Sequence, residues 1–411
     1  MRRYLPSVVF ILVVCPDLAK TADPPWKINE PIVTVEKSLY LPHPPPPPWA
    51  LSLATMEYVG SKLELLETRS KMSIGDVLYD VQQRVSTDNG RTWSDFRPAP
   101  NTEVQYNGVK VAEHSMARFY DDQAGVLVGT FTRILEGFTT YAQISRDYGA
   151  TWSAPQTLRF EEGDEFDPQN PAAPGHHSAN KSYGGNNIIR LASGKLLTSL
   201  GWVKNPDSDP GDPKYSSSLC FAGTWHPAAK DYQWTPGKIV TIPPDKSAKL
   251  VESEVAELQD GRVLVVWRGV NTSTTPGRKW YSISTDGGMT LSPVAELKYD
   301  DGSSFYSPES FHRMIRSRRT GKLYWIGNIT AEPPDHSSPR YPLVIAEVDE
   351  TTEIPSLLKS TVSVIDTRQP DQQEAIQFTN FSLLEDRETE HLQLYMTVNF
   401  DNVYKYIVTF Q

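Results

Sequence analysis

Cysteine is nearly absent from this chain, and so is any long stretch with helical periodicity. The two cysteines are Cys15 and Cys220. Cys15 ends an apolar segment over residues 5–15, which follows two arginines and resembles a secretory signal peptide with cleavage near residue 22. Without residues 1–22 only Cys220 remains, so no intrachain disulfide is available and a large core must stabilise the fold. The apolar segment is too short to span a membrane.

Positive charge is also in short supply, because 40 Lys and Arg face 50 Asp and Glu and give a formal net charge of −10. This acidic balance argues against nucleic acid and anionic membrane surfaces as partners. The leader predicts a secreted or periplasmic protein. Residues 23–50 form a proline-rich lead-in, whose unbroken run 44–48 predicts a stiff polyproline II spacer. Residues 51–411 are expected to form one large domain.

One turn motif occurs three times in the chain, at residues 86–93, 145–152 and 284–291. The first two copies share the pattern S-x-D-x-G-x-T-W, whereas the third ends in Leu291. Each copy stands between short strand-like runs, as a β-hairpin loop does. The aspartate can accept hydrogen bonds from backbone N–H groups of its own turn, the glycine supplies a positive φ, and the tryptophan can pack between strands.

The spacing of these turns predicts a ring of small sheets. The first two copies start 59 residues apart (86 to 145), and the third starts 139 residues after the second (145 to 284). We therefore expect a degenerate copy near residues 224–235. A unit of this size fits a four-stranded propeller blade. The sequence thus predicts an all-β, six-bladed β-propeller, with seven blades as the alternative and with the C-terminal strand paired into the first blade.

Three further turns are each followed by an apolar strand-like run. They are Ser193-Gly194, Asp260-Gly261 and Thr320-Gly321. We interpret the runs that follow them as the inner strands of successive blades.

The pattern S-x-D-x-G-x-T-W resembles the Asp-box, or BNR repeat, of the sialidase (neuraminidase) superfamily. The resemblance covers nearly the whole chain after residue 50. It implies a propeller whose Asp-boxes lie on the outer rim, away from a central pocket that acts on glycans. Because a fold does not by itself fix an activity, the function has to be argued from the pocket residues.

Residues 252–268 resemble the sialidase segment in which a glutamate precedes a V-E-L-x-D-G turn and a strand that ends in arginine. The resemblance places Glu252 beside a tyrosine nucleophile and makes Arg268 a ligand of the substrate carboxylate. A planar guanidinium suits a carboxylate, and a glutamate can take the phenolic proton of the tyrosine. The stretch before the first Asp-box adds Arg69 as a second carboxylate ligand and Asp76 as the acid/base.

The chain departs from the family at its first arginine. No F/Y-R-I-P motif occurs, and residues 50–62 contain no arginine. The third arginine and the tyrosine nucleophile have several candidates. These are Tyr306, Arg313, Tyr324, Arg340 and Tyr341.

These features predict a carbohydrate-active enzyme that hydrolyses terminal acidic sugars of glycans in an exo-acting manner. One alternative is a polysaccharide lyase that cleaves next to a glucuronate. In the lyase, His114 or His177 would remove the C5 proton, and Asn187, Arg190 and Arg268 would neutralise the carboxylate. The other alternative is a propeller that binds glycans without catalysis.

Metal signals are weak in this sequence. Residues 161–170 read EEGDEFDPQN and could hold calcium through carboxylate oxygens. They lack a regular ligand spacing, so a solvated acidic loop is the favoured interpretation. No other cofactor is expected, and the sequence does not predict an oligomeric state.

Overall fold

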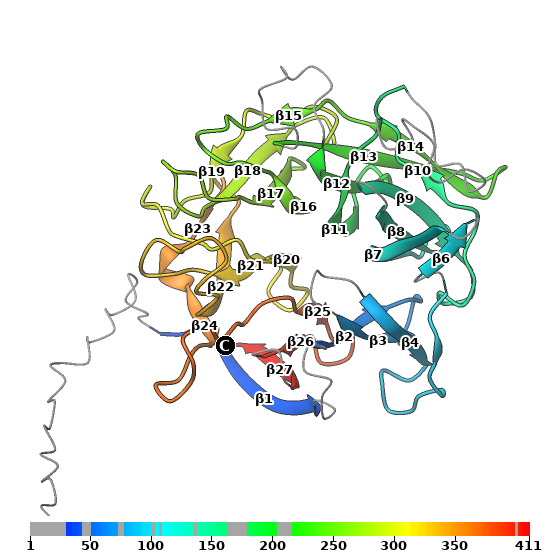
Figure 1. The fold of residues 1–411 in the computed structure, drawn as a ribbon, viewed down its shortest axis with the longest axis horizontal. Coiled ribbons are helices and arrows are strands. Elements are labelled where there is room, and N and C mark those ends of the chain that lie inside the picture. The colour runs from blue at the N-terminus through cyan, green and yellow to red at the C-terminus, as the bar shows by residue number, and fades with distance from the viewer. Residues whose placement is uncertain are drawn as a thin grey trace, which may run out of the picture.

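The computed structural model describes residues 30–42, 51–72, 78–100, 103–106, 109–134, 138–162, 179–203, 216–398 and 402–411. Six β-sheets surround a central axis, and the regular elements of the described chain are strands except for one short 3-10 turn, η1 (Lys359–Thr361) (Figure 1). The prediction of an all-β, six-bladed propeller is therefore confirmed. No helix of the described chain has the length and apolar character needed to cross a membrane. The expected leader and the proline run 44–48 lie outside the described residues.

Each sheet forms one blade, whose strands follow one another from the axis outward. Blade 1 comprises β2 (Leu51–Tyr58), β3 (Leu65–Met72), β4 (Leu78–Ser86) and β5 (Arg97–Pro98). Blade 2 comprises β7 (Val109–Asp121), β8 (Val126–Ile134), β9 (Phe138–Ser145) and β10 (Gln156–Thr157), with β6 (Glu103–Tyr106) paired to the start of β7. Blade 3 comprises β11 (Tyr183–Arg190), β12 (Leu196–Val203), β13 (Ser217–His226), β14 (Asp231–Pro236) and β15 (Val240–Thr241).

The remaining three blades follow in chain order around the ring. Blade 4 comprises β16 (Val251–Glu257), β17 (Val263–Arg268), β18 (Lys279–Ser284) and β19 (Ala295–Glu296). Blade 5 comprises β20 (Arg313–Arg316), β21 (Leu323–Asn328), β22 (Leu343–Asp349), β23 (Ser356–Leu357) and β24 (Ser363–Asp366). Blade 6 comprises β25 (Ser382–Glu385), β26 (Leu392–Thr397), β27 (Val403–Phe410) and β1 (Val33–Leu41).

The two ends of the described chain close the ring within blade 6. Strand β1 pairs antiparallel with β27, from Val33 opposite Phe410 to Leu41 opposite Val403. The N-terminal strand therefore joins the last blade, which reverses the expected pairing of the C-terminal strand with the first. The propeller also begins before residue 51, because β1 lies inside the segment assigned to the lead-in.

The apolar runs after the three glycine turns are second strands rather than inner strands. They are β12, β17 and β21, and the inner strands β11, β16 and β20 precede the turns. The second strands are almost entirely buried, because sheets of both neighbouring blades cover their two faces. The inner strands carry polar residues toward the axis, so their sequences look less like core strands.

All three Asp-box turns connect the third and fourth strands of a blade: β4 to β5, β9 to β10, and β18 to β19. In the second copy, Asp147 Oδ1 accepts hydrogen bonds from Thr151 N and Ser145 Oγ, both at 2.8 Å. The hairpin from β13 to β14 occupies the equivalent place in blade 3, at the position predicted for the degenerate copy. Trp93 and Trp152 are partly buried.

Hydrophobic cores lie between neighbouring blades. Trp325 of blade 5 packs in one cluster with Leu264 of blade 4, and Ile345 of blade 5 packs in another with Leu394 of blade 6. Each blade is thus held by both neighbours, and the ring fixes where the inner strands stand around the axis.

The contact between Gly129 of β8 and the indole of Trp152 can be tested by substitution. A Cβ atom at residue 129 would lie 2.9 Å from two ring carbons of Trp152. Gly129→Ala is expected to lower the free energy of unfolding by about 1–3 kcal/mol through overpacking, measured by denaturant titration. In a Trp152→Phe background the ring is smaller, so Gly129→Ala should lower the free energy of unfolding by a smaller amount. An equal cost in both backgrounds would rule out this contact as the cause.

Candidate functional site

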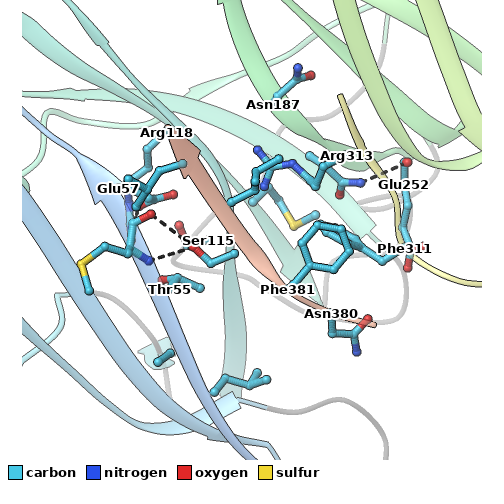
Figure 2. A pocket seen from close by; sticks show the side chains of 18 of the residues that line it. Thr55, Glu57, Ser115, Arg118, Asn187, Glu252, Phe311, Arg313, Asn380 and Phe381 are labelled. Carbon is cyan, nitrogen blue, oxygen red and sulfur yellow. Dashed lines mark hydrogen bonds and ion pairs between the residues drawn. The ribbon is translucent and has the colours of Figure 1, made fainter. Parts of the chain in front are cut away.

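A pocket of about 610 Å³ lies on the propeller axis and is lined by residues of the inner strand of all six blades (Figure 2). This size is within the usual range of small-molecule sites. Aromatic rings line it together with charged and amide side chains. Phe311 and Phe381 approach one another edge to face, with ring centroids 5.4 Å apart. The pocket therefore offers both apolar ring faces and fixed charges.

Three neighbouring inner strands carry β-bulges where they reach the pocket. The register shifts between Ser115 and Ala117 in β7, between Gly184 and Ile188 in β11, and between Val251 and Glu254 in β16. A bulge bends its strand and redirects the side chains beside it. Glu252 lies in the bulge of β16 with a φ of 47°, an uncommon value for a residue other than glycine.

Arg268 and Glu252 meet at the pocket wall. Arg268 ends β17, and its Nη1 donates a hydrogen bond to Glu252 Oε1 at 2.6 Å. Burial alone would lower the pKa of Arg268, but Glu252, Glu309 and Tyr183 together raise it above its usual value. Glu252 Oε2 is buried and accepts no hydrogen bond from any described residue. Glu252 thus keeps one carboxylate oxygen available as a proton acceptor.

Arg313 enters the pocket from blade 5. Its Nε lies 2.7 Å from Glu254 Oε1, and Glu254 Oε2 accepts a hydrogen bond from Met314 N at 2.8 Å. Glu254 is fully buried, and burial raises its pKa to about 7 although Arg313 opposes the shift. Within the described chain no residue forms a hydrogen bond with Nη1 or Nη2 of Arg313. The two terminal nitrogens of this guanidinium are therefore open to a ligand.

Arg340 completes a group of three arginines on this side of the pocket. It lies between β21 and β22, where Nη1 donates to Gln377 Oε1 at 3.1 Å and Nη2 donates to the carbonyl of Glu309 at 2.7 Å. Arg268 and Arg313 line the same pocket. The group presents several guanidinium donors to one space, which is the requirement for binding a carboxylate in a fixed orientation.

An ion pair that the sequence analysis missed lies across the pocket. Arg118 Nη1 of β7 is 2.6 Å from Glu57 Oε2 of β2, and Figure 2 shows this pair on the opposite side from Arg313 and Glu252. The pair links blades 1 and 2. No spacing or motif in the sequence pairs these two residues, because their contact depends on the order of blades around the ring.

Of the residues predicted from the sequence, several line the axial pocket. They are Glu252, Arg268, Arg313, Arg340, His114 and Asn187. His114 lies on β7 and is 7% exposed. Two others, Asp76 and His177, lie outside the described residues, although Met72 and Leu78 on either side of the segment that contains Asp76 line the pocket.

Arg69 and Arg190 do not line the pocket, contrary to expectation. Arg69 Nε pairs with the buried Glu67 at 2.6 Å, and its guanidinium lies 4.6 Å from the ring centroid of Phe96. Arg190 ends β11 beyond the pocket and pairs with Asp121 and Asp122. Both arginines neutralise carboxylates instead, Arg69 within blade 1 and Arg190 between blades 3 and 2.

The tyrosine candidates also differ from expectation. Tyr306 does not line the pocket. Its ring faces the guanidinium of Arg278, whose Cζ lies 4.2 Å from the ring centroid. Tyr324 stacks on Phe410 in the core. Tyr183 of β11, which the sequence analysis did not single out, does line the pocket.

Asn187 has a structural role in the ring. Its Nδ2 donates to the carbonyl of Val255 at 2.8 Å and its Oδ1 accepts from Val255 N at 2.9 Å. Both ends of the amide are thus used to join β11 to β16. Asn186 beside it donates to the carbonyl of Glu252 at 3.1 Å and also lines the pocket.

The candidate calcium loop lies mostly outside the described residues, which begin again at 179. In the part of the chain that the structure describes, no group of three or more His, Cys, Asp and Glu side chains could hold a metal ion.

The chain resembles known proteins in structure rather than in sequence. No protein-family profile matches the chain, and no curated protein matches it by sequence search. A protein of unknown function from Dyadobacter fermentans DSM 18053 is 12% identical, with a TM-score of 0.60 over 92% of this chain and 99% of that chain. The NanB sialidase from Streptococcus pneumoniae is 13% identical, with a TM-score of 0.57 over 86% of this chain and 67% of that one.

A third structure adds to the same group. The intramolecular trans-sialidase from Ruminococcus gnavus is 11% identical, with a TM-score of 0.52 over 86% of this chain and 94% of that chain. At this level of identity the comparisons show the fold. The chain is a sialidase-like β-propeller.

A buried lysine stands directly behind the pocket arginines. Lys279 begins β18 opposite Arg268, is fully buried, and donates from Nζ to the carbonyl of Ser310 at 2.6 Å. Burial, followed by repulsion from Arg268, lowers the pKa of Lys279 to about 7.

The low pKa of Lys279 predicts a pH-dependent stability. Between about pH 7 and the unfolded lysine value of about 10.4 the unfolded state binds more protons, so stability should rise with pH by roughly 1 kcal/mol per pH unit. Lys279→Met removes this contribution. We expect the difference in unfolding free energy, wild type minus variant, to grow between pH 7.5 and 9 in urea titrations. Parallel curves for the two proteins would contradict the prediction.

Proposed function

We propose that the axial pocket binds the carboxylated sugar at the end of a glycan and that the protein hydrolyses the glycosidic bond of this sugar. The observation that carries the proposal is the open guanidinium of Arg313, placed in one pocket with Arg268 and Arg340. A guanidinium with two free terminal nitrogens can bind a carboxylate in a bidentate manner.

The walls of the pocket support a terminal sugar as the ligand. Inner strands of all six blades surround the space, so a single ring can be contacted from every side. Phe311 and Phe381 offer apolar faces, while Glu57 and Arg118 offer polar contacts on the far wall (Figure 2). Expected secretion, or export to the periplasm, would bring the protein to such glycans.

Hydrolysis needs a nucleophile and a proton acceptor near the arginines. Glu252 Oε2 is the unoccupied acceptor, and Tyr183 on the adjacent strand β11 supplies a phenol close enough to Arg268 to raise its pKa. We assign to Tyr183 the nucleophilic role for which the sequence suggested Tyr306. Its oxygen attacks the anomeric carbon as Glu252 takes the phenolic proton, and water then releases the sugar. Asp76 remains the predicted acid/base for the leaving oxygen.

Removal of a pocket arginine tests the binding step. Arg313→Ala and Arg268→Ala are each expected to weaken binding of a carboxylated sugar by about 2–5 kcal/mol, because a charged hydrogen-bonded partner is lost. Arg313→Lys should restore only part of the affinity, since an ammonium cannot form the bidentate pair. Calorimetric titration measures the loss.

Arg91→Ala provides the matched control for these variants. Arg91 lies in an Asp-box turn at the rim, where it pairs with Glu388 and is 61% exposed. Its removal should leave the affinity unchanged. Unchanged affinity in the Arg313 and Arg268 variants would overturn the assignment of the carboxylate site.

A uronate-specific lyase is the second candidate function. The observation in its favour is that His114 lies in the same pocket as Arg268 and Asn186. In this reaction a base removes the C5 proton of the uronate, the C4–O bond breaks, and a C4–C5 double bond forms while the arginines neutralise the carboxylate. His114 is the candidate base.

Product analysis of two variants separates the hydrolase from the lyase. A hydrolase releases a free acidic sugar from sialosides, and Tyr183→Phe should reduce its rate at least about a hundredfold, since the nucleophile is lost. A lyase produces an unsaturated uronate with ultraviolet absorbance, and His114→Ala should abolish that product. Far-ultraviolet circular dichroism checks that both variants fold. Binding of either glycan without any product would identify a glycan-binding propeller.

A further inference from the structure

Glu309 stands behind two of the three pocket arginines. It precedes β20, and its side chain is 12% exposed. Glu309 Oε2 lies 3.7 Å from Arg268 Nη2, while its backbone carbonyl accepts the hydrogen bond from Arg340 Nη2 at 2.7 Å. Its Oε1 accepts a hydrogen bond from Asn271 N at 3.1 Å. One residue therefore contacts Arg268 through its carboxylate and Arg340 through its backbone.

His336 lies between Glu309 and solvent. The His336 ring Nδ1 lies 2.9 Å from Glu309 Oε1, and the His336 carbonyl accepts a hydrogen bond from Glu309 N at 2.9 Å. The imidazole side chain is 66% exposed, so it can exchange protons freely. A continuous series of contacts thus runs from an exposed imidazole, through a mostly buried carboxylate, to a guanidinium in the pocket wall.

We infer that Glu309 and His336 act as a positioning pair that sets how strongly Arg268 and Arg340 attract an anionic sugar. When His336 is protonated, its positive charge offsets part of the negative charge of Glu309. The arginines then present a more positive potential to the pocket. When His336 is neutral, Glu309 keeps its full charge for Arg268 and opposes a second carboxylate. The inference rests on the carboxylate binding proposed above.

The charges around the pair decide the direction of the effect. The groups that face His336 are Glu309 and Asp335, and the hydrogen bond to Glu309 is the main cause that raises the pKa of His336 above 6.5. Behind Glu309 lie Arg268, Arg340 and the buried Lys279. Protonation of His336 therefore adds one positive charge to a cluster that already holds arginines and carboxylates in near balance.

Affinity for a carboxylated sugar should consequently fall as the pH rises through the pKa of His336. A sugar carboxylate with a pKa of about 3.5 stays ionised throughout this range and does not contribute. With solvent screening taken into account, we expect a decrease of about three- to tenfold between pH 5.5 and 8.

The experiment compares wild type with His336→Gln, whose amide can keep the hydrogen bond to Glu309 but cannot become charged. Titration calorimetry with N-acetylneuraminic acid and with glucuronic acid at pH 5.5, 6.5, 7.2 and 8 gives the affinities. Both proteins should lose affinity as the pH rises, and the decrease should be larger in wild type than in the variant. Glu254 and Lys279 also titrate near pH 7, but they are present in both proteins, so the difference isolates His336.

His226→Gln is the matched control, because His226 is exposed at the end of β13 in blade 3, whereas Glu309 precedes β20 of blade 5. Its pH profile should equal that of wild type. Equal profiles for wild type and His336→Gln would overturn the inference while the proposed carboxylate site stands. Failure of wild type to bind either sugar would overturn the proposed site, and the inference with it.

A second measurement tests the pair without any ligand. Nuclear magnetic resonance titration of the His336 imidazole should give a pKa above 6.5 in wild type and a lower one in Glu309→Gln. An imidazole that titrates identically in both proteins would show that Glu309 does not act on His336, and would overturn the inference.

Discussion

Compensation of buried charge is the constraint on which the centre of this propeller depends. Several arginines reach the axis, and a charge in such a place is tolerated only when a partner offsets its lost hydration. Arg118 meets Glu57, Arg268 meets Glu252, and Arg313 meets Glu254. Each glutamate comes from an inner strand, so the positions of the arginines follow from the positions of the blades.

The bulges explain how an ordinary sheet can deliver these partners. In a regular strand, alternate residues face opposite sides, so Glu252 and Glu254 would share one side of the sheet. The extra residue in β16 breaks this alternation, leaving Glu252 at the pocket wall and Glu254 buried beneath Arg313. The same device in β7 and β11 alters the direction of side chains near His114 and Asn186. The Asp-box hairpins connect the outer strands of blades 1, 2 and 4, away from this centre.

The fold could be predicted because its signals are local. An Asp-box depends on hydrogen bonds within eight residues, and each copy marks the same connection in its blade. Glu252 and Arg268 could be identified for a similar reason, since they flank one hairpin. The strands after the glycine turns were wrongly placed, because a strand buried between two blades has the same apolar pattern that is expected of an inner strand.

The rest of the site could not be read from the sequence. Arg190 ends a strand, as Arg268 does, and Arg69 lies inside β3, but nothing local in the sequence says whether these side chains reach the axial pocket. Glu57 and Arg118 lie on different blades, and their contact is set only when the ring is assembled. Asp76 and His177 stay predictions. Tyr183 lacked a motif, and only its place on β11 next to Glu252 makes it notable.

The pairing of β1 with β27 has a consequence for how the chain folds. Val33 and Phe410 are neighbours in one sheet although almost the entire sequence separates them. Among the described strand pairings this one closes the longest loop of chain, and it cannot form until the last strand has been synthesised. Blades 1 to 5 can assemble in order on a growing chain. Until β27 has been synthesised, β1 lacks its pairing partner. Its charged and polar residues, among them Glu36 and Lys37, disfavour association with other chains during that interval.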